Sequence, residues 1–563
     1  MNTDTLNPAP PSADDRASKR MLALKYAEDG RLATRHEMGD ERASLTNSER
    51  IKLEKPGPQV WRDIVENYSK NGFESIHEDD FERFKWVGVY QQKPKDGYFM
   101  MRVKVAGGQL NNAQLRGMSA VARTFADGIG DITTRQTIQI HWLTIENMPA
   151  VMDVLGQVGL GAKHELFGAC GDICRNIVSS PLTGLDPRDV LDPTEFFLEA
   201  NRFFSSNLDY ADLPRKYKAA IVGHREGAQC EINDISFYGV QRSDGRVGYG
   251  VMVGGGLSTE PHLALDLEVF VVPEDGMTVM EAVTRIFRDH GYRKSRKHAR
   301  FKYLVADWGA AKVRAEIESI LGRPMEDAER TQSGIRGYQD LYGVHPQKQP
   351  GLNFLGVPVV AGRLTSDQLD AIADISQELG SGDVRLTVMQ SLYIINVPDA
   401  NVAEAAARLE YIGLPIDVSP VRGGVVACTG TQYCNLAVTE TKQRAHDLVN
   451  LLDAGVKWSE SDFFRVNVNG CPNSCGQHWI ADVGLQGCTK KIDGELVEHY
   501  DMFLGGQLGD EARFNRRIKR VAAEEVAPAI QRAVDKYQNG RAEGESFAHW
   551  VARHTDEELA EIL

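Results

Sequence analysis

Apolar residues recur along the chain in two similar series of predicted elements. Each series opens with an apolar stretch that has glycine near its end, continues with the period of an amphipathic helix, and closes with a second apolar stretch. The first predicts a strand over Tyr98–Leu110, a helix over Asn112–Ala126 and a strand over Asp131–Leu143. The second predicts a strand over Leu352–Leu364, a helix over Ser366–Leu379 and a strand over Asp383–Val397. The repeated order indicates an internal duplication.

Three further pairs of segments follow these elements in the same order. We align Ala169–Asn176 with Ala427–Asn435, Arg215–Gly223 with Phe464–Gly470, and Gly250–Leu257 with Asp501–Leu508. The pattern predicts an α+β protein whose two halves are related by a pseudo-two-fold axis. Because ligand sites usually lie in clefts between such units, we expect the functional site at their interface.

Composition and charge narrow the class of protein. Of the 563 residues, 42% are hydrophobic and 25% are charged, as in ordinary globular proteins. The net charge of −15 disfavours nucleic acid as a partner, because phosphate contacts need a basic surface. No apolar run reaches the roughly 18 residues that span a bilayer, and the N-terminus lacks the apolar core of a signal peptide. We expect a cytoplasmic protein that acts as a monomer and binds neither a membrane nor nucleic acid.

Four of the eight cysteines cluster in the second half of the chain. Cys428 and Cys434 enclose five residues, and Cys471 and Cys475 enclose three, with glycines and other small or turn-forming residues between and beside them. Such residues let backbone N–H groups approach sulfur, and four thiolates suit a 4Fe–4S cluster. Zinc prefers shorter spacings, so it fits less well, but zinc or simply buried thiols remain alternatives at this point.

The run N-G-C-P-N-S-C-G at Asn469–Gly476, preceded by C-x5-C, resembles the signature of the sirohaem and 4Fe–4S sulfite and nitrite reductase family. The resemblance extends from about Phe84 to about Gly509 and includes the internal duplication. It implies that the cluster is held by Cys428, Cys434, Cys471 and Cys475. It also implies that Cys475 is the axial ligand of the sirohaem iron and so bridges the two cofactors.

The resemblance also implies a division into domains. Residues 1–80 form an N-terminal extension, with helices expected over Arg16–Asp29 and Pro58–Ser69. Residues 81–150 and 346–415 are expected to be two ferredoxin-like half-domains. Residues 151–345 form a sirohaem and substrate domain, and residues 416–563 form the cluster and sirohaem domain with C-terminal helices.

A small oxyanion that is reduced at such a centre needs fixed positive charge and proton donors. The resemblance assigns these roles to Arg102, Arg175, Lys216 and Lys218. Lys216 and Lys218 are two residues apart, so on a strand they share a face. Taken without the family, each of the four residues is an ordinary solvated cation.

The carboxylates of a sirohaem need cationic and hydrogen-bonding partners. Arg135, Gln139 and His141 alternate along the predicted strand and should point the same way. Arg300 and Lys302, from the basic run 293–302, and Asn473, between two cluster cysteines, are further candidates. The alternative is that these are ordinary buried polar residues.

Two features favour sulfite over nitrite as the substrate. The motif Lys-x-Lys at Lys216 and Lys218 resembles the motif of the sulfite reductases in the family, whereas the nitrite reductases more often have Asn at the position of Lys218. A second cation adds more binding energy for a doubly charged anion than for a singly charged one. Tyr90 and Cys170 stand where some ferredoxin-type sulfite reductases carry a Tyr–Cys thioether link. Nitrite reduction remains the alternative.

The electrons must come from another protein, because no flavin domain or G-x-G-x-x-G nucleotide motif stands out. The resemblance implies ferredoxin as the donor, with a flavoprotein as the alternative. The function expected is the six-electron reduction of sulfite to sulfide. The non-enzymatic alternative is an iron–sulfur sensor, which would not need the set of anion-binding cations.

Overall fold

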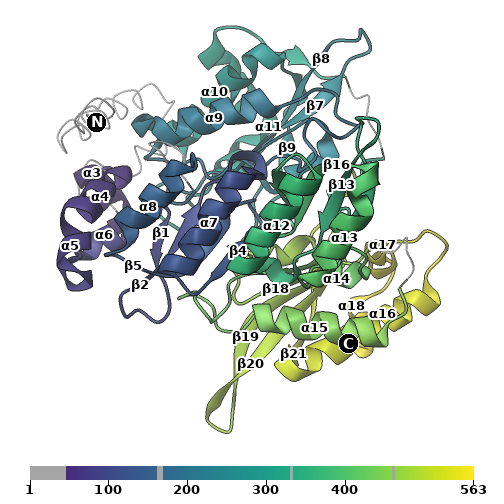
Figure 1. Cartoon of the computed structure of the whole chain (residues 1–563). Helices are drawn as coiled ribbons and strands as arrows, with labels where there is room; N and C mark the ends of the chain where they lie inside the picture. Colours follow the sequence, from purple (N-terminus) through teal and green to yellow (C-terminus); the bar gives the residue numbers. More distant parts are fainter. Residues whose placement is uncertain (1–45, 161–168, 330–333, 459–462) are drawn as a thin grey trace.

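The computed structural model describes residues 46–160, 169–329, 334–458 and 463–563 (Figure 1). The helix expected over Arg16–Asp29 lies outside the described residues. The next segment contains α3 (Asn47–Glu54), α4 (Val60–Asp63), α5 (Ser69–Asn71) and α6 (Glu78–Arg83). A π-helical turn, Ile64–Tyr68, joins α4 to α5, so the helix expected over Pro58–Ser69 forms. Val60, Ile64 and Tyr68 pack into the core of the first half-domain.

The two half-domains contain the same elements in the same order. The first contains β1 (Val89–Gln91), β2 (Tyr98–Val103), β3 (Gln109–Asn111), α7 (Asn112–Phe125), β4 (Ile129–Ile132), β5 (Ile138–Thr144) and α8 (Met148–Gln157). The second contains β12 (Gly343–Pro346), β13 (Leu352–Val357), β14 (Arg363–Thr365), α12 (Ser366–Leu379), β15 (Asp383–Leu386), β16 (Leu392–Pro398) and α13 (Val402–Tyr411). Each long apolar stretch predicted as one strand is therefore two strands with a turn between them.

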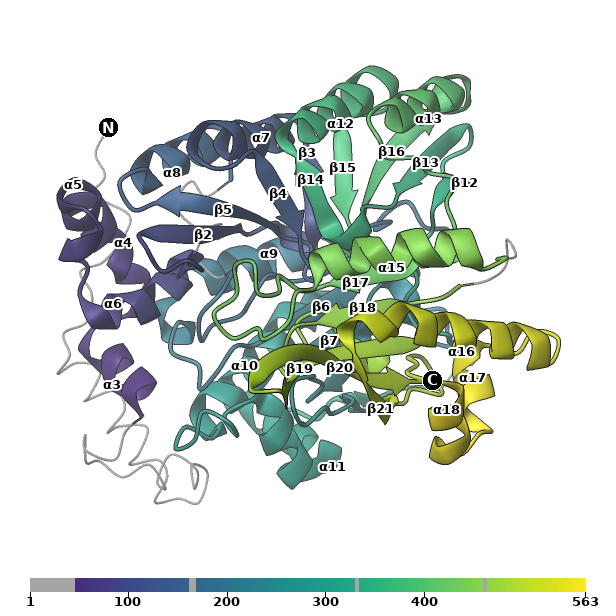
Figure 2. The ribbon, with the colours of Figure 1, turned by 90° about the horizontal axis from the view of Figure 1, so that it is seen from below.

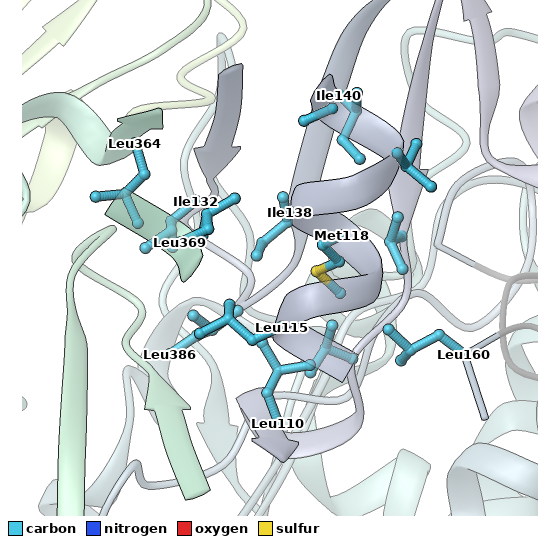
Figure 3. Packing of buried hydrophobic residues seen from close by; sticks show 14 of the residues in the cluster. Leu110, Leu115, Met118, Ile132, Ile138, Ile140, Leu160, Leu364, Leu369 and Leu386 are labelled. Atoms are coloured by element: carbon cyan, nitrogen blue, oxygen red, sulfur yellow. The ribbon is translucent and has the colours of Figure 1, made fainter. Parts of the chain in front are cut away.

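The half-domains exchange edge strands. One sheet has the order β1-β2-β5-β4-β14, and the other has the order β12-β13-β16-β15-β3, so each sheet ends in a strand from the other half. Helices α7 and α12 pack side by side, as Figures 1 and 2 show, and each starts with a capping box, at Asn111 and Thr365 respectively. One continuous apolar core fills both half-domains; Figure 3 shows Leu110 and Leu386 from the two halves within it.

The two larger regions also repeat. The first contains α9 (Thr194–Ser206), β6 (Ala219–Val222), β7 (Ile235–Gln241), β8 (Val247–Val253), β9 (Leu265–Asp266), β10 (Val269–Phe270), α10 (Gly276–His290), α11 (Phe301–Leu321) and β11 (Glu326–Asp327). The second contains α14 (Pro420–Gly424), β17 (Val425–Ala427), α15 (Lys442–Gly455), β18 (Val466–Asn469), β19 (Val483–Ile492), β20 (Glu495–Leu504), β21 (Arg516–Ala522), α16 (Val526–Gly540), α17 (Phe547–Ala552) and α18 (Asp556–Ile562). Their sheets have the orders β6-β7-β8-β9 and β17-β18-β19-β20-β21, with β6–β7 and β18–β19 parallel.

The strand register corrects one alignment made from the sequence. Val178 pairs in parallel with Ala220 just as Val426 pairs with Asn467, so Ser180, and not Cys170, is the counterpart of Cys428. The predicted pairing of Ala169–Asn176 with Ala427–Asn435 is therefore wrong. Both segments contain two cysteines, but these cysteines do not occupy equivalent positions in the fold. By the same register, His224 stands in the place of Cys471.

Two buried glutamines tie the halves together in a symmetric way. Gln136 donates to the carbonyls of Ser179 (2.9 Å) and Leu386 (2.8 Å) and accepts from the Ser179 N–H (2.9 Å). Gln390 donates to Ile132 (3.1 Å) and Ala427 (3.0 Å) and accepts from the Ala427 N–H (2.8 Å). Each half-domain is thus held to the other half-domain and to the larger region that follows it.

Replacing Gln136 by alanine should lower the free energy of unfolding by about 1–3 kcal/mol, because the buried Ser179 N–H loses its partner. Thermal unfolding followed by fluorescence would measure the loss. Gln443→Ala is a suitable control because its hydrogen bond to Asp447 is exposed. Equal melting temperatures for the two variants would contradict the role given to Gln136.

No helix of the described residues is both long enough and apolar enough to cross a lipid bilayer.

Candidate functional site

Two extended segments bring three of the predicted anion-site cations together. The segment that carries Arg175 runs in parallel beside the segment that leads into β6, where Cys174 pairs with Tyr217. The Arg175 N–H donates to the Tyr217 carbonyl (2.7 Å), and the Tyr217 N–H donates to the Ile173 carbonyl (3.1 Å). The Tyr217 side chain is buried in the core, so Lys216 and Lys218 are directed to the opposite side, as their spacing predicts.

One buried carboxylate anchors this arrangement. Asp234 has no exposed surface, accepts the Lys218 N–H (2.8 Å), and pairs with Arg300 through two oxygens (3.0 and 2.8 Å). The nearby Arg135 donates to the Asn233 side chain (2.8 Å) and to the carbonyls of two other residues. Asp234 therefore fixes the backbone of one cation and the side chain of another.

The electrostatics show that positive charge is crowded here beyond what local carboxylates balance. Burial, together with Arg300 and Arg175, lowers the pKa of Lys216 to about 7. Burial, Arg135 and Lys216 hold the pKa of Lys218 well below its usual range. Burial lowers the pKa of Arg135 to about 9, although Asp234 acts in the opposite direction. A site of this kind is stabilised by a bound anion.

Arg102 connects this group to Tyr90 and Cys170. Its Nη1 lies 2.7 Å from the Cys170 Sγ, and its guanidinium lies 5.6 Å from the centre of the Tyr90 ring. Burial opposes the charge of Arg102, but the negative charges of Cys170, Tyr90 and Cys475 raise its pKa overall. Burial and the charge of Cys170 raise the pKa of Tyr90. Tyr90, Arg102 and Cys170, from distant parts of the sequence, therefore form one contact group.

Parallel strands explain how the cysteine loops meet. β17 and β18 run in parallel and end at the same edge, so Cys428 follows one and Cys471 follows the other. The Gly470 N–H donates to the Cys428 sulfur (3.2 Å), and the Leu436 N–H donates to the Cys434 sulfur (3.4 Å). Backbone N–H groups directed at sulfur are typical of iron–sulfur sites.

The loop that contains Cys475 is tightly constrained. Ser474 and Gln477 adopt φ of 55° and 62°, a backbone conformation that residues other than glycine rarely adopt. A Cβ at Gly470 would lie 2.9 Å from the Thr439 carbonyl oxygen, so glycine is required there. The Thr134 hydroxyl, in the turn after β4, donates to the Cys475 carbonyl (3.0 Å). The first half-domain thus holds the cysteine that approaches the cations.

The four thiols fit a cluster better than a single ion. Burial and the charges of Cys475 and Cys471 raise the pKa of Cys428 to about 12, and Cys475 and Cys434 likewise act on Cys471. In the part of the chain that the structure describes, no three His, Cys, Asp or Glu side chains are grouped as ligands of one metal ion. A zinc ion requires all its sulfurs at about 2.3 Å, whereas a cluster spreads four thiolates around its corners.

The charge of Cys475 also acts on both Lys216 and Arg102. The cysteine set and the cation set, which lie in different halves of the sequence, therefore share one site. Among the residues that the structure describes, the buried Nε atoms of Arg102 and Arg135 have no hydrogen-bond partner. Crowded cations and unpaired buried donors are the features expected of a site for a polycarboxylate macrocycle and a small anion.

The predicted partners of the macrocycle do not all lie on one strand. Arg135 lies in the turn between β4 and β5, so the expectation that it alternates with Gln139 and His141 along one strand is wrong. Gln139 and His141 do lie on β5, where Gln139 pairs with Arg102 across the sheet. The turn could not be recognised in the sequence, because it lies between two apolar strands and contains no glycine or proline.

His141 has partners of its own. Its Nδ1 lies 3.2 Å from the Gln92 side chain, its ring stacks on Tyr433 at 4.0 Å, and its Nε2 lies 3.8 Å from Asp131. Burial lowers its pKa to about 3, so the ring is neutral. Any role of His141 at the macrocycle is therefore that of a neutral hydrogen-bonding group and not that of a cation.

Two of the hydrogen-bond donors of Lys302 are already used, because its ammonium group donates to the carbonyls of Leu257 (3.1 Å) and Glu260. Burial and Arg300 lower its pKa to about 8. Asn473 approaches Cys471 through backbone and side-chain hydrogen bonds. It therefore belongs to the cysteine loop.

Asp234, Asn176 and Thr134 are site residues that sequence reasoning missed. Asn176 donates to the carbonyls of Val105 (2.6 Å) and Arg135 (2.8 Å) and so holds the Arg135 turn in place. A correct alignment of the halves would have found Asp234, because Asp482 accepts the Arg465 N–H (2.9 Å) just as Asp234 accepts the Lys218 N–H. Nothing in the local sequence marks Asn176 or Thr134.

The pseudo-symmetric position in the second half is filled. Met389 precedes Gln390 as Arg135 precedes Gln136, and it is buried in an apolar cluster with Val388 and Tyr338. The apolar side chain of Met389 cannot make the ionic and hydrogen-bonding contacts that Arg135 can make. Only one of the two related positions therefore retains the chemistry described above.

Comparison with known proteins identifies the family. Residues 170–325 and 421–563 match the family described as nitrite and sulphite reductase 4Fe-4S domain. Residues 90–158 and 345–411 match the nitrite/sulfite reductase ferredoxin-like half domain.

Similar proteins cover nearly the whole chain. Sulfite reductase (ferredoxin) 1 of Mycolicibacterium paratuberculosis is 38% identical, over 93% of this chain and 97% of its own length. Sulfite reductase (ferredoxin) of Mycobacterium tuberculosis is 39% identical, over 90% of this chain and 95% of its own. The assimilatory ferredoxin-dependent nitrite reductase of Haloferax mediterranei is 36% identical, over 89% and 90%. The structure of the Mycobacterium tuberculosis NirA protein superposes with a TM-score of 0.87 and 38% identity, covering 92% of this chain and 97% of that one. The chain therefore belongs to the nitrite and sulfite reductase 4Fe–4S family.

Proposed function

We propose that this protein is a ferredoxin-dependent sulfite reductase that carries out the six-electron reduction of sulfite to sulfide. The observation that carries the proposal is the crowd of buried cations beside Cys475. Sulfite reductases among the similar proteins support it. When bound, the 4Fe–4S cluster would relay the electrons that the donor protein supplies, and the sirohaem would provide the iron at which the substrate is reduced.

In this proposal Cys428, Cys434, Cys471 and Cys475 would hold the cluster, and Cys475 would also ligate the sirohaem iron. Their backbone N–H contacts and their two converging loops support the assignment. The domain boundaries at about residues 80, 150, 345 and 415 are part of the same proposal.

Arg102, Arg175, Lys216 and Lys218 bind the anion and stabilise the oxygens as they leave. The arginines stay charged, so they fix the position of the anion through their hydrogen bonds. Lys216, whose pKa lies at about 7, can both hold a proton and give it up near neutral pH. Water is the product of each oxygen's departure, so proton donors within the site are required.

Arg135, Arg300 and Lys302 are the proposed cationic partners of the sirohaem carboxylates, with Gln139, His141 and Asn473 lining the macrocycle. The charge of Arg135 acts on the neighbouring Lys218, and this supports a place for Arg135 beside the anion site. The bonds of Arg300 to Asp234 indicate that it also orients that carboxylate.

A pH profile should reveal Lys216. Lysine loses its charge as the pH rises through about 7, so anion affinity in the wild-type enzyme should fall across that range. The Lys216→Arg variant keeps its charge and should lack this step. The ratio of the two KM profiles removes the titration of sulfite itself. A constant ratio between about pH 6 and 8 would contradict this assignment.

The contact group of Tyr90 and Cys170 is a candidate for the thioether link. The proximity of both residues to Arg102 supports it. The link replaces a Tyr90 ring C–H bond and the Cys170 S–H bond by one C–S bond, and a two-electron oxidant such as dioxygen must take up the two hydrogens. Mass spectrometry of a digest should therefore find one peptide that joins the two segments, lighter by two hydrogens than its separate parts. Recovery of the two unlinked peptides alone would exclude the link.

We propose ferredoxin as the electron donor, since several of the similar proteins carry it in their names. Action as a monomer in the cytoplasm is part of the same proposal. All eight cysteines lie among the described residues and none of them forms a disulfide, which supports a reducing compartment.

The proposal is tested by incubating the purified holoprotein with reduced ferredoxin and sulfite. Sulfide should form with the consumption of six electrons per anion, on protein whose visible spectrum shows sirohaem. A protein that holds a cluster but reduces neither anion would support the sensor alternative.

A further inference from the structure

A buried network of ion pairs joins the N-terminal helix α3 to the segments that carry the anion-site cations. Its centre is Asp172, which is 3% exposed and lies three residues before Arg175. Arg296 grips both oxygens of Asp172 (2.6 and 3.1 Å), and Lys52 of α3 lies 3.4 Å from one of them. The Asp172 carboxylate thus connects residues that are far apart in the sequence.

The same two cations also hold the second segment. Lys52 donates to the Leu213 carbonyl (2.9 Å), and Arg296 donates to the Pro214 carbonyl (3.1 Å). The Leu213 N–H in turn donates to the Asp172 carbonyl oxygen (3.0 Å). Each cation therefore bridges the segment that precedes Arg175 and the segment that precedes Lys216.

The rest of the network neutralises these charges. Glu49 pairs with Lys52 (2.5 Å) and with the fully buried Arg293 (3.0 Å). Asp212 lies 3.2 Å from Lys52 and 3.3 Å from Arg293. Three carboxylates therefore meet three cations. A buried network of this kind is sensitive to the loss of one member, because its partners are then left as uncompensated charges.

The placement of this network gives it a role beyond stability. The anion is bound by cations on two separate segments, so its affinity depends on the distance between those segments. Backbone hydrogen bonds join the two segments directly, and at this network side chains from elsewhere in the chain brace that pairing. A group that holds two binding elements in register changes affinity when it is lost, even though it does not touch the ligand.

We propose that Asp172, clamped by Lys52 and Arg296, is a positioning residue for the anion site, and that helix α3 is thereby part of the functional machinery. The inference rests on the proposed function, which makes Arg175, Lys216 and Lys218 the anion-binding cations and sulfite the anion.

The test compares Lys52→Met with Lys55→Met in the holoenzyme. Lys55 follows the same helix and also pairs with two carboxylates, Asp63 (2.7 Å) and Asp80 (2.9 Å), but both of these partners belong to the N-terminal helical segment and not to the two cation-bearing segments. Lys52→Met should raise the KM for sulfite roughly tenfold to a hundredfold with kcat within about twofold. Lys55→Met should leave both unchanged, and Lys52→Arg should restore most of the affinity.

Hydrogen exchange without substrate supplies a readout that does not depend on turnover. The amides of Arg175 and Tyr217, which bond between the two segments, should exchange faster in Lys52→Met than in Lys55→Met. Arg296→Gln is the second variant, for use in case Lys52→Met does not fold, because the Arg296 side chain is 22% exposed. It should give the same pattern of exchange.

Three results would overturn the inference: equal KM changes in Lys52→Met and Lys55→Met, a fall in kcat alone, or unchanged exchange in both segments. Failure of the wild-type protein to reduce sulfite would contradict the proposed function, whereas the exchange result would still decide this inference.

Discussion

Cys475→Ser is expected to yield a folded protein without sirohaem absorbance and with sulfite reduction below roughly a thousandth of the wild-type rate. The reason is that one thiolate is proposed to serve both cofactors, and an alcohol is a poor ligand for either iron site. The loop around it is already fixed by Gly470 and by the Thr134 hydroxyl, so the protein scaffold should remain. Iron and acid-labile sulfide per chain, with the visible spectrum, measure the loss.

Cys488→Ser is the matched control. Cys488 is a half-exposed thiol on β19 of the same region and lies outside the two cysteine loops. It should retain full iron content and turnover. A Cys475→Ser protein with wild-type iron and sirohaem would remove Cys475 from the proposed ligands.

Lys218→Asn is expected to lower kcat/KM for sulfite roughly a hundredfold, as loss of one preorganised cation does in other oxyanion sites. Turnover of nitrite should fall by less than about tenfold, because a singly charged anion gains less from the second lysine. Steady-state kinetics on both anions with the same donor measure the difference.

Unfolding cannot account for this expected loss. The pKa of Lys218 is held well below its usual range by burial and by Arg135, so the folded state disfavours its charge. A neutral Asn should leave the melting temperature unchanged or raise it. Lys348→Asn, at an exposed lysine, is the control for general effects. Equal losses on the two anions would contradict the specificity argument.

The sequence was most informative where the chemistry is local. The cysteine loops are short and made of turn residues, so their ligand spacing and the approach of backbone N–H groups could be anticipated. The repeated strand–helix–strand order likewise predicted the duplication. Exchange of β3 and β14 between the half-domains could not be predicted, because short edge strands pair through backbone atoms that leave no pattern in the sequence.

Long-range partners were the part that the sequence could not supply. The turn at Arg135 is stabilised by Asn176, which is distant in the sequence, and contains Gln136 at positive φ, where glutamine is not a typical residue. Asp234 acts through Arg300 and the Lys218 backbone, which are distant in sequence. Cysteines misled the alignment of the halves, since the true counterpart of Cys428 is Ser180.

The most direct test of the central claim is the ratio of kcat/KM for sulfite to kcat/KM for nitrite, measured with reduced ferredoxin on the sirohaem-containing enzyme. The account predicts a ratio above one, because two lysines face the anion beside Arg175 and Arg102. A clear preference for nitrite would contradict the proposed substrate and the role given to Lys218, while leaving the family and fold as described.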